Sequence, residues 1–236
     1  VLILDRIPSR ADEPFENFLS ELEKEFKSIQ KKIGNEIELK AVGVGAPDTN
    51  CFTGEMENPP NFDWGEVVPL AEGINRVMGL PVYVNNDANV AALGEMKYGG
   101  GKGMKHLIVA TLGTGVGSGF IVDGKLHIGQ DGMAGELGHT TAVRDGRQCK
   151  CGLKGCLEQY ASVTGIRRTV QELVENSNTK SPLDQYSFEE LTGKIIADAA
   201  HENDSIAQEA FEITGKMLGQ NLADAVAYFN PEAIFI

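Results

Sequence analysis

Apolar residues in the first hundred positions of the chain recur with two different periods. Seven of them between Phe15 and Ile33 follow helical spacing and predict an amphipathic helix that ends near Gly34. Shorter apolar runs bounded by Gly and Pro predict strands. The predicted strands cover residues 1–4, 39–45 and 81–85, and further predicted helices cover residues 67–78 and 88–98. Strands that alternate with helices are typical of a layered α/β sheet.

The second half of the chain begins with a predicted hairpin and then becomes helical. Residues 106–112 and 120–122 predict two strands, and the glycine-rich segment 113–119 predicts the turn between them. The remaining predicted elements are helices at residues 166–173, 195–200 and 206–228 and a strand at residues 233–236. Another glycine-rich stretch, Gly99 to Gly103, precedes the hairpin and predicts a linker.

Composition and charge narrow the class of protein. At 236 residues with 42% hydrophobic content, the chain can bury a sizeable core. Its formal net charge of -13 opposes binding to nucleic acid or to anionic lipid. No apolar run approaches the roughly 20 residues that cross a bilayer, and no signal peptide is visible. We therefore expect a cytoplasmic protein whose ligands are small molecules, with no nucleic acid and no membrane as partner.

The cysteines cluster in a way that favours metal binding. Three of the four lie between Cys149 and Cys156, in a loop so short that a disulfide would strain it. Cys149, Cys151 and Cys156, together with His139, supply the three thiolates and one imidazole of a closed tetrahedral zinc site. A closed set leaves no open position for catalysis, so the predicted zinc is structural. The alternative is a chance cluster of buried cysteines, and the fourth, Cys51, is expected to be a half-buried apolar residue.

The glycine-rich turn is a candidate phosphate site. Its alternating glycines let backbone N–H groups face an anion without obstruction by a Cβ. It is neither a Walker loop nor a Rossmann fingerprint, because no Lys-Ser/Thr pair follows it and both flanks are predicted strands. The alternative is an ordinary tight hairpin. The candidate phosphate-binding residues are Gly113, Thr114, Gly115 and Gly117.

A candidate catalytic base lies where a predicted strand meets a predicted helix. Asn86 and Asp87 follow the strand directly, and a carboxylate in that position could take a proton from an alcohol. The alternative for Asp87 is helix capping, in which its side chain satisfies free N–H groups of the next helix. Glu136 and Glu158 flank the cysteine cluster, and carboxylates beside a rigid metal site suit a polyhydroxylated ligand. Taken alone, each could equally be an ordinary solvated carboxylate.

Five motifs together resemble the ROK family of repressors, open reading frames and kinases, and especially its bacterial glucokinases. They occur in the family's order and near its spacing over nearly the whole chain. Concordance of several motifs is far stronger evidence than any one of them. The motifs are Gly45-Ala46-Pro47, Asn86-Asp87-Ala88-Asn89, Leu112 to Gly117, Glu136-Leu137-Gly138-His139 and Cys149 to Glu158.

The resemblance implies an actin-like, ribonuclease-H-like fold of two α/β domains. The smaller domain would cover residues 1–101, and the larger, with the zinc knuckle, residues 102–236. Asp87 would be the base that activates the sugar 6-hydroxyl, and His139 would serve both the zinc and the sugar. Asn61 is a further candidate for the sugar pocket, although turn chemistry explains it as well. The implied sugar-binding residues are Asn86, Asp87, Glu136, His139 and Glu158.

The implied activity is ATP-dependent phosphorylation of a hexose, with magnesium supplied with ATP. Glucose is the expected sugar, and N-acetylglucosamine, N-acetylmannosamine, mannose and fructose are the alternatives within the family. The family commonly forms dimers, so a homodimer is expected. The rival from another class is a sugar-responsive transcriptional repressor, which would need a helix-turn-helix module. A zinc-knuckle interaction module without chemistry would leave the glycine turn and Asp87 unexplained.

One part of the family pattern has no counterpart. The Asp-x-Gly-Gly-Thr hairpin of the family's first phosphate motif is not found, and the adenosine-side glycine turn would follow Ile236. The chain also opens on an apolar run without an initiator Met. We therefore expect elements of the fold to be missing at both ends and this segment alone to bind ATP poorly.

Overall fold

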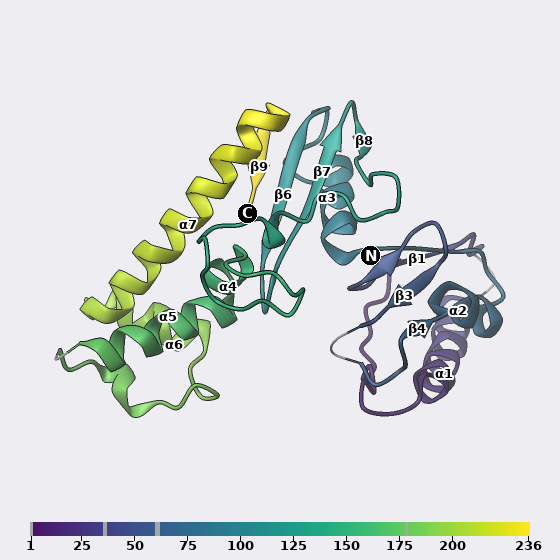
Figure 1. Ribbon diagram of the computed structural model, residues 1–236. Coiled ribbons are helices and arrows are strands. Elements are labelled where there is room, and N and C mark those ends of the chain that lie inside the picture. Colours follow the sequence, from purple (N-terminus) through teal and green to yellow (C-terminus); the bar gives the residue numbers. More distant parts are fainter. Residues whose placement is uncertain (1, 35–36, 60–61, 178) are drawn as a thin grey trace. The chain divides into compact units, whose positions relative to one another are not determined.

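The computed structural model divides into two compact units of contacts (Figure 1). The described residues are 2–34, 37–59, 62–177 and 179–236. Unit 1 comprises Val1–Val90 and Ile128–Ala134, and unit 2 comprises Ala91–His127 and Gly135–Ile236. Compactness alone does not define independently folding domains, so the expected boundary between residues 101 and 102 stays a prediction.

Unit 1 is built on a two-stranded parallel sheet with helices packed against it. Strands β1 and β5 pair in register, with Val42 opposite Val82. Leu19, Ile74 and Val84 bury together in the apolar core between the helices and this sheet. Because strand β5 is anchored in this core, the residues that follow it start from a fixed position. The elements are α1 (Phe15–Ile33), β1 (Val42–Gly45), β2 (Thr49–Asn50), β3 (Glu55–Glu57), β4 (Val67–Val68), α2 (Leu70–Met78) and β5 (Val82–Asn85).

The first ninety residues depart from their prediction at two points. Residues 2–10 form no strand, and Leu2 and Leu4 are exposed, because no described strand lies beside them to share hydrogen bonds. The helix predicted from residue 67 begins only at Leu70, after Pro69. The residues before Pro69 join a small antiparallel sheet instead, in which Val68 lies opposite Met56 of β3.

Unit 2 contains a four-stranded sheet in the order β8-β7-β6-β9. The predicted hairpin is present, with β6 and β7 antiparallel, and β9 joins the other edge of β6 in parallel. The strands are β6 (Leu107–Leu112), β7 (Val116–Val122), β8 (Lys125–Leu126) and β9 (Ala233–Phe235).

Helices cover both faces of this sheet. Leu107 and Val109 of β6 pack with Met96 of α3 (Asp87–Tyr98), which begins in unit 1 and continues into unit 2. Ile108, whose side chain points to the opposite face, packs in a second cluster with Leu157 and with Ala225 of α7. The strand is buried on both sides, which explains its continuous apolar run.

A helical layer follows the cysteine segment. Its core includes Ile166, Val170, Ile196 and Ala207, all nearly inaccessible to solvent. The three helices predicted after residue 157 are present, each somewhat longer than expected. The elements are η2 (Leu137–His139), α4 (Glu158–Ala161), α5 (Val163–Asn176), η3 (Pro182–Gln185), α6 (Gly193–His201) and α7 (Ser205–Phe229). Among the described helices, none combines the length and the apolar character that a membrane span requires.

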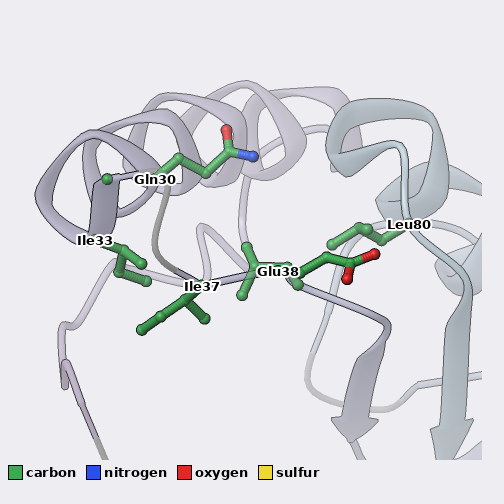
Figure 2. A pocket seen from close by; sticks show the side chains of 7 residues that line it. Gln30, Ile33, Ile37, Glu38 and Leu80 are labelled. Atoms are coloured by element: carbon green, nitrogen blue, oxygen red, sulfur yellow. The ribbon is translucent and has the colours of Figure 1, made fainter.

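A hollow of about 550 Å³ lies in unit 1, beside the end of α1 (Figure 2). It combines aliphatic side chains with one carboxylate and one amide. None of the predicted sugar, phosphate or metal residues lines it, so it is not part of the candidate site. Its lining residues are Gln30, Ile33, Gly34, Ile37, Glu38, Leu39 and Leu80.

Candidate functional site

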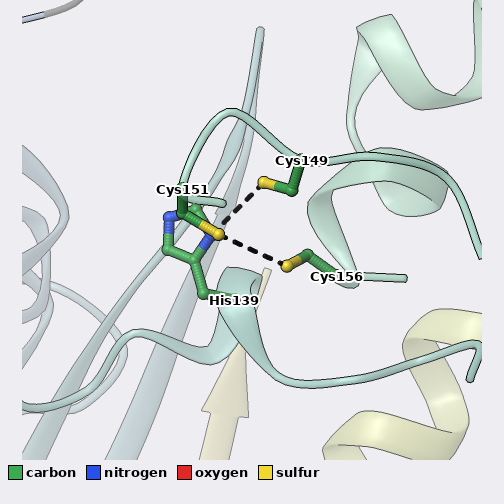
Figure 3. Close-up of side chains that lie close together, drawn as sticks. All are labelled: His139, Cys149, Cys151 and Cys156. Atoms are coloured by element: carbon green, nitrogen blue, oxygen red, sulfur yellow. Dashed lines mark hydrogen bonds between the residues drawn. The ribbon is translucent and has the colours of Figure 1, made fainter. Parts of the chain in front are cut away.

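The four predicted metal ligands converge at one point in unit 2 (Figure 3). The ligand atoms of His139, Cys149, Cys151 and Cys156 all lie within 4.8 Å of one another. Cys149 Sγ lies 3.7 Å from His139 Nδ1, and Cys151 Sγ lies 3.6 Å from Cys156 Sγ. Tetrahedral coordination with a Zn–S bond of about 2.3 Å places ligand atoms roughly 3.7 Å apart. The donor set and its spacing therefore fit a tetrahedral metal site.

A short turn with its own hydrogen bonds orients the cysteines. Cys149 N–H donates to the Leu153 carbonyl at 2.9 Å, and Gly152 N–H donates to the Cys149 carbonyl at 3.2 Å. The Gln148 side-chain amide also lies 3.1 Å from the Cys149 carbonyl oxygen. Because these contacts need no metal, the thiols are oriented by the chain itself.

Ionisation of the thiols differs across the cluster. Burial, reinforced by the thiols of Cys151 and Cys149, raises the pKa of Cys156 to about 12. Partial burial also opposes ionisation of Cys151, but hydrogen bonds with the Leu153 backbone and the neighbouring thiols outweigh it and lower the pKa of Cys151. A bound cation would favour the thiolate form of all three cysteines.

Glu136 and His139 lie at the two ends of the short turn that contains η2. Glu136 is exposed and His139 is half-buried. Leu137 N–H donates to Ser118 Oγ at 3.0 Å, and the same hydroxyl donates to the Gly135 carbonyl. Ser118 is buried in β7, so its hydroxyl group links the turn to the sheet, and Leu137 also packs with Val116 and Phe120 of that strand.

The glycine turn is shorter than the sequence predicts. Strands β6 and β7 pair as far as Leu112 and Val116, so the turn consists of Gly113–Gly115. The predicted turn over residues 113–119 is therefore too long, because the β ladder continues through its second half. Gly117 lies inside β7, opposite Thr111. A phosphate-binding role for Gly117 stays a prediction.

The carbonyl side of the turn faces the helical layer. Val163 N–H donates to the Gly113 carbonyl and Thr164 Oγ1 donates to the Thr114 carbonyl, both at 2.9 Å. Within the described part of the chain, the N–H groups of Thr114 and Gly115 donate to no protein acceptor. The carbonyl groups of Gly113 and Thr114 are thus hydrogen-bonded within the protein, whereas these two N–H groups are available to an external anion.

Glu158 lies between this turn and the metal cluster. It opens α4 two residues after Cys156, and its Oε2 accepts a hydrogen bond from Val116 N–H at 3.2 Å. A Cβ on Gly115 would overlap the same carboxylate oxygen, so a larger residue there would have to displace Glu158. The other carboxylate oxygen of Glu158, Oε1, lies 3.5 Å from the side-chain nitrogen of Gln159. The turn, Glu158 and the cluster thus form one connected polar set.

In unit 1, Asp87 occupies the first position of α3. Asn86 Oδ1 accepts hydrogen bonds from Ala88 N–H at 2.9 Å and from Asn89 N–H at 3.4 Å. Asn86 therefore caps the start of α3, which is the role that was the alternative for Asp87. Asp87 is exposed, and its Oδ1 also accepts from Ala88 N–H at 2.9 Å. Its other carboxylate oxygen takes no part in the cap.

Asn89 is a buried residue of this corner that sequence reasoning did not single out. It is 3% exposed, and its Nδ2 donates to Asn85 Oδ1 at 3.0 Å. Asn85 Oδ1 also accepts from Asn86 N–H at 2.9 Å, so the two amides fix the corner between β5 and α3. The only sequence signal for Asn89 is its place in the Asn-Asp-Ala-Asn motif.

The structure brings part of the predicted site together. Within unit 2, Glu158, the glycine turn and the four metal ligands are connected, and Glu136 shares the η2 turn with His139. Asn86 and Asp87 lie in unit 1, and their action on the same ligand stays a prediction. Asn61 lies outside the described residues.

Known proteins resemble the chain over most of its length. A model of the family described as the ROK family matches residues 5–236. The glucokinase of Streptomyces coelicolor is 39% identical over 210 residues, which cover 87% of this chain and 65% of that enzyme. The xylose repressor of Caldicellulosiruptor bescii is 33% identical over 211 residues, which cover 89% of this chain and 53% of the repressor. The chain thus spans 65% of the length of this glucokinase.

Solved structures extend the likeness to three dimensions. The chain is similar to a ROK family glucokinase from Streptomyces griseus, whose crystal structure contains glucose and AMPPNP. The two share 34% identity with a TM-score of 0.77, over 94% of this chain and 71% of that one.

Replacing Gly115 with Ala is expected to destabilise the protein by about 1–3 kcal/mol, because the new methyl must push Glu158 away from Val116 N–H. Gly113→Ala is the matched control, since a Cβ at that position meets nothing within 4 Å. Its stability should change by less than about 0.5 kcal/mol. Urea denaturation measures both values, and equal stability of the two variants would contradict the placement of Glu158.

In the metal-free protein near pH 8, iodoacetamide should modify Cys151 before Cys156. The lowered pKa of Cys151 favours its reactive thiolate, whereas Cys156, with a pKa of about 12, stays protonated. A Cys51→Ser background removes the remaining thiol outside the cluster. Trypsin cleavage after Lys150 and Lys154 separates the two cysteines, so mass spectrometry can follow each one. Modification of Cys156 first would contradict the described environments.

Proposed function

The chain belongs to the ROK family, and we propose that the protein carrying it transfers a phosphoryl group from ATP to the 6-hydroxyl of a hexose, with glucose as the preferred sugar. Its fold is the actin-like, ribonuclease-H-like α/β fold of ROK sugar kinases, as the sequence predicts. The observation that carries the proposal is the position of Glu158. A carboxylate suited to a sugar hydroxyl is hydrogen-bonded beside a turn whose free N–H groups suit a phosphate.

Asp87 is assigned the role of general base. Its carboxylate takes the proton of the 6-hydroxyl as the sugar oxygen forms a bond to the γ-phosphorus, and the bond to ADP breaks. The cap made by Asn86 supports this role, because it leaves Asp87 Oδ2 outside the helix hydrogen bonds. Phosphoryl transfer needs positioning and charge stabilisation more than covalent chemistry.

The sugar-binding roles follow from which atoms are already occupied. Asn86 uses its Oδ1 for the cap, so its amide N–H groups are the part that can donate to a hydroxyl. His139 turns Nδ1 toward the cluster, which leaves Nε2 for the sugar. Glu136 and Glu158 accept hydrogen bonds from hydroxyl groups, as carboxylates do.

The phosphate role is assigned to the glycine turn. The N–H groups of Thr114 and Gly115 face no protein acceptor among the described residues and would hold phosphate oxygens of ATP. Magnesium carried with the nucleotide would neutralise charge on the phosphates. We assign Gly113 the part of closing the turn, because its N–H donates to the Gly115 carbonyl at 3.0 Å.

We assign structural zinc to the cluster of His139, Cys149, Cys151 and Cys156. A set of three thiols and one imidazole favours zinc over harder cations. The chemistry that zinc would supply is structural, since the four donors leave no position for a reactant. Zinc there would hold η2 and the start of α4 together, and with them Glu136 and Glu158.

The identity of the sugar and the setting of the enzyme are proposed from the relatives and from the chemistry of the ligands. Glucose is favoured by the likeness to glucokinases, and the other hexoses and N-acetylated hexosamines are alternatives. A cytoplasmic homodimer that binds no nucleic acid is proposed, since ATP and a thiol-rich metal site both suit a reducing compartment. A sugar-responsive repressor is the second candidate, because a xylose repressor is 33% identical. It would bind sugar without turnover.

Asp87→Asn is expected to lower kcat about 10²- to 10⁴-fold with little change in KM for glucose, because the base is lost while the sugar contacts remain. Asp224→Asn, on the exposed side of α7, is the matched control and should keep wild-type rates. A coupled ADP-release assay on the full-length protein over glucose, mannose, fructose, N-acetylglucosamine and N-acetylmannosamine measures both. Undiminished turnover of Asp87→Asn would remove the base, and activity only on an N-acetylated sugar would overturn glucose.

Elemental analysis should find about one zinc ion per chain, bound by the four donors of the cluster. Cys149→Ser should lose most of this zinc, because three donors bind far more weakly than four. Cys51→Ser serves as the control, since Cys51 lies outside the cluster. No zinc in the wild type, or equal zinc in both variants, would sink the assignment.

A further inference from the structure

Gln159 touches both the metal cluster and Glu158. It is 7% exposed, in the single turn of α4. Its Nε2 donates to Cys149 Sγ at 3.5 Å and lies at the same distance from Glu158 Oε1. A side-chain amide carries two N–H groups, so one can face the sulfur and the other the carboxylate.

Arg168 fixes which way the Gln159 amide points. The Arg168 guanidinium donates from Nη1 to Gln159 Oε1. A guanidinium can only donate, so the oxygen must face Arg168 and the nitrogen must face Cys149 and Glu158. The positive charge of Arg168 also polarises the amide, which strengthens both N–H donations.

Arg147 holds the backbone of the same residue. Its Nη1 donates to the Gln159 carbonyl at 2.6 Å, and its Nη2 donates to Glu172 at 2.6 Å. The guanidinium also lies over the Tyr160 ring, 4.5 Å from its centre. The Gln159 side chain therefore has little freedom to leave its two acceptors.

We propose that Gln159 is a positioning residue that couples the metal cluster to the Glu158 carboxylate. One N–H group donates to the Cys149 sulfur and the other orients Glu158, so the same amide serves the metal and the sugar. The sugar half of this inference rests on the proposed function. The metal half does not, because the contact with Cys149 exists whatever the protein phosphorylates.

Outer partners of metal ligands typically change metal affinity about 10- to 100-fold when removed. Gln159→Met keeps the length of the side chain and removes both N–H donors. Gln159→Glu keeps the size and a partner for Arg168, but it places a carboxylate where the donors were. Gln171→Met, at an exposed position of α5, is the matched control.

The first test follows zinc release from the loaded protein into a colorimetric chelator. Both Gln159 variants should release zinc about tenfold faster than wild type, and Gln171→Met should match wild type. In cobalt-loaded protein, the thiolate-to-metal charge-transfer band should move to lower energy in Gln159→Met, because the sulfur loses an N–H donor. A general loss of stability would not shift this band. Wild-type release rates and an unmoved band would overturn the metal half.

The second test is a double-mutant cycle read by glucose titration of zinc-loaded protein. Gln159→Met should weaken glucose binding about tenfold in the wild-type background and leave it unchanged in a Glu158→Ala background, which lacks the carboxylate acceptor. An equal effect in both backgrounds would overturn the coupling, because Gln159 would then act independently of Glu158. Failure of the wild-type protein to bind glucose would instead overturn the proposed function, and the release rates would still decide the metal half.

Discussion

Three thiols and an imidazole lie within 4.8 Å of one another in unit 2, and a bound cation would favour the thiolate form of the cysteines. Buried thiols without one resist ionisation, and neighbouring thiolates would repel. The candidate site of unit 2 depends on this constraint, because η2 ends at one ligand, His139, and α4 begins just beyond another, Cys156. Bound zinc would therefore hold together the segments that carry Glu136 and Glu158.

Sequence reasoning succeeded where the signal was local. The amphipathic helix from Phe15, the strand before Asn86 and the Cys149 knuckle all follow from spacing or composition over a few residues. It failed where the outcome depended on distant partners. Leu2 and Leu4 have a strand-like pattern, but none of the described strands lies beside them.

The candidate site shows the same contrast between local signals and distant partners. Ligand types and the strand-to-helix corner could be found from the sequence, whereas the contact between Glu158 and Val116, 42 residues apart, could not. Gln159 and Asn89 were not singled out for the same reason, because the role of a side-chain amide depends on the groups that it contacts after folding. Within a family that contains both kinases and sugar repressors, hydroxyl recognition serves either class. Under the proposed function, Asp87 and the N–H groups of the turn would add what transfer of a phosphoryl group requires.

The four donors of the cluster all come from the segment between residues 139 and 156, whereas Leu107 of β6 pairs with Ala233 of β9 near the other end of the chain. Closing a short loop costs less entropy than bringing distant strands together. The knuckle can therefore close early in folding, before the edge of the sheet is complete. A cation captured at that stage would act as a nucleus, and Glu136 and Glu158 would be ordered with it.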